Sequence, residues 1–102
     1  MFLKDILNEL DYRLLLNKYD FDYLKSIDYC NFMEVYIFLE NRNVYFINDL
    51  LIHYLEIFTL DFVIVEKAFN ALFKKYGDDY ISIIGNNMSL LDDAIIVILE
   101  KY

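Results

Sequence analysis

The chain has no proline and only two glycines, Gly77 and Gly85, so very little in it interrupts a helix. Helix boundaries must therefore be read from apolar spacing and from capping side chains. Over residues 2–18 the apolar side chains recur at helical spacing, and the alternation typical of a strand fails. The sequence predicts one helix there, with its apolar face made by Leu3, Ile6, Leu7, Leu10, Leu14 and Leu15.

Residues 20–28 are acidic and predict no more than one helical turn. Asn31 followed by Glu34 has the form of a capping box, in which each side chain satisfies the other residue's free backbone N–H. This pattern predicts a helix over residues 32–40.

Apolar residues continue at helical spacing after residue 43, which predicts a helix over residues 44–58. The alternative is a β-hairpin near residues 35–47, with its turn at 41–43. We favour the helix because this turn lacks glycine. The apolar positions that define it are Val44, Ile47, Leu51, Leu55 and Phe58.

Towards the C-terminus, Asp61 predicts the cap of a helix over residues 62–76, and Gly77 is its expected left-handed stop. A short helix is expected over residues 79–84, ended by Gly85.

Ser89 is expected to cap the last helix, and the nearly unbroken apolar run 94–99 predicts that this helix is the most buried. The sequence thus predicts a single all-α domain over residues 1–102, a compact bundle of five or six short helices. The minor alternative is an α+β fold that contains the hairpin. Because 59% of the residues are apolar, some apolar side chains must face outward, toward a partner or a second copy.

Chemical machinery is scarce in the sequence. His53 has no Cys or Ser beside it that would form a nucleophile pair, and Cys30 has no local cation and is expected to be a small core residue. Asp92 and Asp93 are explained as first-turn acids favoured by the helix dipole. No phosphate loop, EF-hand or zinc pattern is present. We therefore expect no enzyme activity, no cofactor and no bound metal.

Acidic residues outnumber basic ones by 17 to 9, which gives a formal net charge of −8. This balance disfavours nucleic acid and anionic membranes as partners and suits a basic protein. Residues 19–66 hold nine acids against two bases, a net charge of −7. No signal peptide and no run of about 20 apolar residues is found, so a cytoplasmic location is expected. Acidity also keeps an apolar domain soluble and by itself identifies no partner.

The candidate partner-binding site lies within this acidic stretch. On the predicted helix 44–58, an aromatic residue, two acids and a histidine fall at steps of four, four and three on one face. Tyrosine is a favoured interface anchor, and carboxylates bind Arg or Lys on a partner. The candidate residues are the stripe Tyr45, Asp49, His53 and Glu56, with the further acids Glu34, Glu40, Asp20 and Asp22.

In its small size, high acidity and helical character, the chain resembles the immunity proteins of bacterial toxin systems, both of the colicin type and of contact-dependent growth inhibition. The resemblance rests on no motif. It implies a cytoplasmic protein that binds and neutralises a basic toxin domain, often a nuclease. A homodimer is a further possibility, because outward-facing apolar side chains could also bind a second copy. One alternative is a phage- or plasmid-encoded inhibitor that mimics nucleic acid, of the anti-CRISPR or anti-restriction type. Another is a structural or oligomerising helical module.

Overall fold

The structure is a computed structural model that describes residues 2–101, and 82% of it is helical. In chain order the elements are α1 (Leu3–Ile6), α2 (Glu9–Lys18), α3 (Phe21–Ser26), α4 (Tyr29–Asn41), α5 (Ile47–His53), the 3₁₀ helix η1 (Leu55–Thr59), α6 (Phe62–Tyr76), the 3₁₀ helix η2 (Gly77–Asp79), α7 (Tyr80–Asn86) and α8 (Ser89–Glu100). The all-α prediction is confirmed. The hairpin alternative is wrong, because α4 runs through most of residues 35–47 and no strand occurs in residues 2–101.

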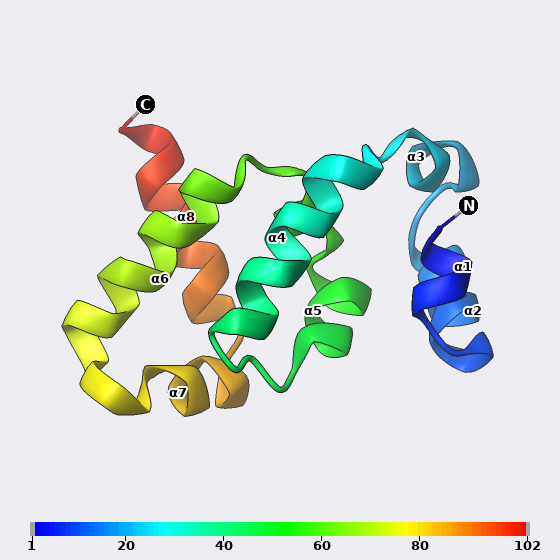
Figure 1. Cartoon of the computed structure of the whole chain (residues 1–102). Coiled ribbons are helices and arrows are strands. Elements are labelled where there is room, and N and C mark those ends of the chain that lie inside the picture. The colour runs from blue at the N-terminus through cyan, green and yellow to red at the C-terminus, as the bar shows by residue number, and fades with distance from the viewer. Residues whose placement is uncertain (1, 102) are drawn as a thin grey trace.

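The helices pack on both sides of α4 (Figure 1). The three short N-terminal helices lie together on one side. Helices α6 and α8 lie against each other on the other side, and α7 connects them at one end. Helix α5 and η1 pack against α4 itself. The structure has more helical elements than the predicted five or six, because two of the predicted long helices are each divided in two and because residues 21–26 form α3.

Aromatic rings link these layers. Phe32 of α4 is fully buried and stacks on Phe58 of η1, with ring centroids 5.0 Å apart. The ring of Phe2 also packs against Phe32, edge to face, with the two ring centroids 4.9 Å apart. Further along α4, Phe38 meets the fully buried Phe69 of α6 edge to face at 5.5 Å. Helix α4 is therefore the element against which both sides of the core pack.

The predicted helix 2–18 is broken between α1 and α2. Helix α1 ends before Leu7, whose backbone is extended. Asn8 starts α2, because its side-chain oxygen accepts a hydrogen bond from the backbone N–H of Asp11 at 2.8 Å. The break changes which face of the second helix meets the core. Leu10 and Leu14, both predicted to be core residues, are 69% and 47% exposed.

The predicted capping box at Asn31 is also wrong, because Asp28 caps α4 one turn earlier. The Asp28 carboxylate accepts a hydrogen bond from the backbone N–H of Cys30 at 3.0 Å. The Asn31 amide is therefore free to reach η1. It donates to the carbonyl oxygens of Phe58 at 3.1 Å and Leu60 at 2.8 Å.

The predicted helix 44–58 is two elements. Helix α5 begins only at Ile47, after a turn in which Asn43 adopts a positive φ of 62°. Tyr54, at φ −138° and ψ 47°, ends α5, and η1 follows. The apolar residues of both α5 and η1 face the core. Their helical spacing therefore continues across the break at Tyr54, and the sequence pattern does not reveal the break.

Gly85 does not end the short helix but lies inside α7. A Cβ atom built there would lie 2.9 Å from Cζ of Tyr45 and 3.1 Å from Cδ1 of Phe46. The glycine therefore makes room for the turn that precedes α5. At the end of α6, both predicted signals are confirmed: Asp61 accepts from the Val63 N–H at 3.1 Å, and Gly77 adopts a φ of 74°.

The last helix differs from the prediction in two ways. Ser89 does not cap it, since its hydroxyl donates to Oδ1 of Asn87 at 2.6 Å and Met88 occupies the cap position. Nor is α8 the most buried helix, because it lies at the edge of the bundle and only Leu91 and Ile95 are buried. Its outer side exposes Ile96, Val97 and Leu99.

Within residues 2–101 no single helix combines the length and apolarity needed to cross a membrane. One bent pair, Phe62–Asn86 with Ser89–Glu100, meets that test by length and composition only, and the two parts meet at 111°.

The hydrogen bonds of the Asn31 amide are expected to stabilise the packing of α4 against η1. We expect Asn31→Ala to lower the free energy of unfolding by about 1–3 kcal/mol, because two partly buried carbonyl groups lose their donor. Glu34→Ala, an exposed position on the same helix, serves as the control and should change stability by no more than about 0.5 kcal/mol. Urea unfolding followed by circular dichroism measures both, and equal losses would contradict this role of Asn31.

Candidate functional site

All eight candidate residues are exposed, as a partner-binding site requires, but they lie on several elements. Asp20 and Asp22 are at the start of α3, and Glu34 and Glu40 are on α4. The remaining candidates lie before, within and after α5: Tyr45, Asp49, His53 and Glu56.

The predicted stripe is therefore not one helical face. Only Asp49 and His53 share a helix, at the i, i+4 spacing that places two side chains on one face. Tyr45 lies in the turn before α5, where its ring meets Phe46 edge to face at 5.0 Å. Glu56 belongs to η1, beyond the break at Tyr54.

The acids of α4 are also separated. Glu34 and Glu40 are six residues apart, which turns their side chains by roughly 120° around the helix axis. The acidic residues of the stretch 19–66 thus form a broad negative surface over several elements.

Glu56 has a defined environment that the sequence did not reveal. Its Oε2 accepts a hydrogen bond from the Tyr19 hydroxyl at 3.1 Å, which ties α2 to η1. Lys18 strengthens this junction, since its Nζ donates to the carbonyl oxygen of His53 at 2.8 Å. Burial, with the nearby charge of Glu56, raises the pKa of Tyr19 to about 12.

The charge of Glu56 also acts on the start of α8. The pKa of Asp92 is raised above its ordinary value, first by burial and then by the charges of Glu56 and Asp93. Their positions near the start of α8 predict that Asp92 and Asp93 stabilise the helix dipole. In the folded chain, burial and neighbouring acids outweigh that benefit at Asp92. Nothing local in the sequence indicates this, because Glu56 and Asp92 are brought together only by the fold.

Among the residues that the structure describes, few of these negative charges are neutralised by an ion pair. The ion pair found between residues 2–101 joins Arg13 to Glu9 at 2.6 Å, outside the acidic stretch. Arg42, one of the two bases in residues 19–66, lies 4.9 Å from the ring centroid of Phe38 and donates to the Tyr80 hydroxyl at 3.2 Å. Lys25, the other base, lies over the ring of Phe21. The stretch therefore presents its negative charge to solvent.

The groups considered for catalysis gain no partner for that role. Cys30 is exposed, which corrects its expected place in the core, because α4 begins earlier than predicted. His53 is exposed as well, and its backbone carbonyl binds Lys18. Among the described residues, no three His, Cys, Asp or Glu side chains are placed to hold one metal ion.

The raised pKa of Asp92 has a consequence for stability. A raised folded-state pKa means that this group stabilises the fold below its ordinary pKa of 3.8 and loses that contribution as the pH rises. We therefore expect Asp92→Asn to raise the Tm at pH 7, with a gain that shrinks as the pH falls toward 3. Asp22→Asn, in the first turn of α3, is the control and should give no gain. Thermal unfolding at several pH values measures both, and an equal gain from the two would indicate relief of overall charge.

Comparison of the chain with protein-family models, with curated proteins and with solved structures gives no match. What this chain does must therefore be inferred from its own surface, of which the exposed carboxylates and exposed aromatic rings are the most distinctive parts.

Proposed function

We propose that this chain is a protein-binding inhibitor of a basic protein. In its specific form the proposal is an immunity protein of a bacterial toxin system, which acts in the cytoplasm and neutralises a toxin domain with nuclease activity. The supporting observation is the stretch 19–66, which has a net charge of −7 and whose two bases contact aromatic rings.

Electrostatics gives the physical reason. A nuclease concentrates positive charge in its active site in order to hold phosphates, so an exposed field of carboxylates attracts that face from a distance. Such attraction raises association rates by about 10- to 1,000-fold and is weakened by salt. A toxin inhibitor benefits directly, because the toxin must be captured before it acts.

Exposed apolar and aromatic side chains supply the short-range part of binding. Tyr45 is 69% exposed and lies in the turn before α5, the helix that carries Asp49. Rigid aromatic side chains of this kind are frequent anchors of interfaces. The exposed apolar residues Ile96, Val97 and Leu99 of α8 are also open to a second copy. We expect the free protein to be a monomer, which light scattering will test.

The decisive experiment uses the nuclease domain of a toxin encoded beside this gene. The chain should inhibit DNA or RNA cleavage stoichiometrically. Reversing two exposed acids, Glu34→Lys with Asp49→Lys, should slow association at least about tenfold at low salt and flatten its salt dependence. Glu56 is left intact because it holds Tyr19 and affects Asp92.

The matched control reverses two exposed acids outside the acidic stretch, Asp78→Lys with Asp79→Lys in η2. It changes the net charge equally and should slow association much less. Equal slowing by both pairs would mean that total charge, rather than this surface, governs binding. Failure to inhibit the neighbouring nuclease would contradict the proposed function.

A further inference from the structure

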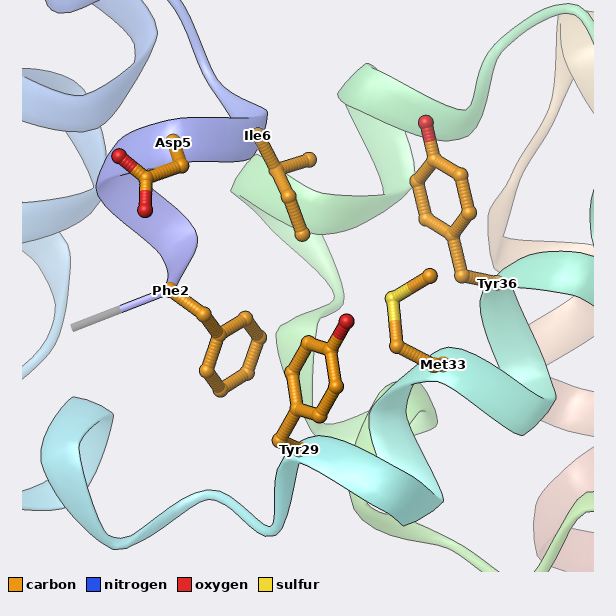
Figure 2. Close-up of a pocket in the computed structure, with 6 residues that line it drawn as sticks. All are labelled: Phe2, Asp5, Ile6, Tyr29, Met33 and Tyr36. Carbon is orange, nitrogen blue, oxygen red and sulfur yellow. The ribbon is translucent and has the colours of Figure 1, made fainter.

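A cleft between α1 and α4 is lined almost wholly by aromatic and other apolar side chains (Figure 2). Its volume is about 320 Å³, at the lower end of the range of roughly 300–1,000 Å³ for ligand pockets. The helix α4 side presents Tyr29, Met33 and Tyr36, which share one face at spacings of four and three. The residues that line the cleft are Phe2, Asp5, Ile6, Tyr29, Met33 and Tyr36.

Of the three rings that line the cleft, Tyr29 is exposed, and Phe2 and Tyr36 are half-buried against Phe32. Figure 2 shows Phe2 and Tyr29 side by side at one end and Tyr36 at the other, with Met33 between them. Phe2 and Tyr29 meet edge to face at 5.1 Å, and Tyr29 remains 54% exposed. Methionine adapts its shape to what it contacts, which suits a surface that receives another side chain.

Elsewhere in this chain, aromatic rings of the surface already hold cations. Within residues 2–101, the shortest such distance is the 4.9 Å between Arg42 and the ring centroid of Phe38. The others are Lys18 over Tyr19, Lys25 over Phe21 and Lys75 over Tyr76. None of these four cations lies over a ring of the cleft, and the residues that line it include no lysine or arginine.

The one charged residue that lines the cleft is acidic. Asp5 lies on the α1 edge, and Figure 2 shows its carboxylate pointing away from the rings of Tyr29 and Tyr36. A cation lying on the rings would meet no positive charge within the lining, and the chain as a whole has a net charge of −8. Aromatic rings in an acidic chain, with no cation of that chain over them, suit a positive group with an apolar stem.

We propose that this cleft binds an arginine side chain of a basic partner protein. Guanidinium fits better than ammonium because it is planar, stacks on aromatic rings and is less strongly hydrated, so less is lost on leaving water. The inference rests on the proposed function for the identity of the partner, but the binding chemistry is a property of the cleft and is tested without that partner.

The test uses N-acetylarginine methylamide as the probe and N-acetylcitrulline methylamide as its uncharged counterpart of similar shape. Methyl-labelled methionine reports the site, because Met33 lines the cleft and Met88 precedes α8. In NMR titrations of the whole chain, the arginine probe should shift the Met33 methyl signal saturably in the millimolar range and leave Met88 unchanged. The citrulline probe should bind several-fold more weakly. Equal binding of the two probes, or no Met33 shift, would overturn the proposal.

Substitutions in the cleft test whether the arginine probe binds there. Tyr29→Ala and Tyr36→Ala should each weaken probe binding by about threefold, whereas Tyr36→Phe should retain it, because a cation is attracted by the ring rather than by the hydroxyl. Phe73→Ala, at an exposed aromatic residue outside the cleft, is the matched control and should bind the probe normally. Tyr29 is the safer site if Tyr36→Ala unfolds the protein, since Tyr29 is more exposed.

The two proposals fail in different ways. If the neighbouring nuclease is inhibited equally well by the wild type and by Tyr29→Ala, the cleft is not the anchor site, while the proposed function stands. If the nuclease is not inhibited but the Met33 signal responds to arginine alone, the cleft binds guanidinium and the proposed partner is wrong.

Discussion

The arrangement of the other helices depends on the contacts that the buried ring of Phe32 makes. Its ring is fully buried and lies 4.9 Å from Phe2 and 5.0 Å from Phe58, so it joins the N-terminal segment and η1 to α4. The neighbouring Asn31 makes the same connection through hydrogen bonds to the carbonyl groups of Phe58 and Leu60. An apolar contact and a polar contact from adjacent residues thus fix one register of α4 against η1, and the helices on either side follow from it.

Much of the fold is predictable from the sequence where the signals are local. Helix α6 has its predicted bounds because Asp61 and Gly77 act through backbone groups within one turn of themselves. Predictions failed where a residue serves a distant segment. Gly85 makes room for Tyr45, and Asn31 reaches η1, yet each resembles a local stop or cap when read in sequence.

In the candidate site, too, local sequence signals predicted some features and failed for those that depend on distant segments. That the acids are exposed could be predicted from their number, because carboxylates are rarely buried without partners. How the acids group on the surface could not be predicted. The predicted stripe required an unbroken helix, which Tyr54 interrupts, and Glu56 instead affects Asp92, 36 positions further along the chain. The aromatic cleft was not predicted because Tyr29 lies before the predicted helix 32–40, whereas α4 begins at Tyr29, and because only the fold brings α1 against this face.

Ion pairs are scarce within residues 2–101, and the carboxylates left without one respond to ionic strength in two opposite ways. Carboxylates that repel one another are brought closer by folding, so small cations that gather around them favour the folded chain. The same cations screen the attraction between this surface and a positively charged one. A basic protein that docks here replaces that ion cloud with fixed charges of its own. The free chain is therefore under its greatest electrostatic stress in dilute salt, the condition in which its surface attracts a cationic partner most strongly.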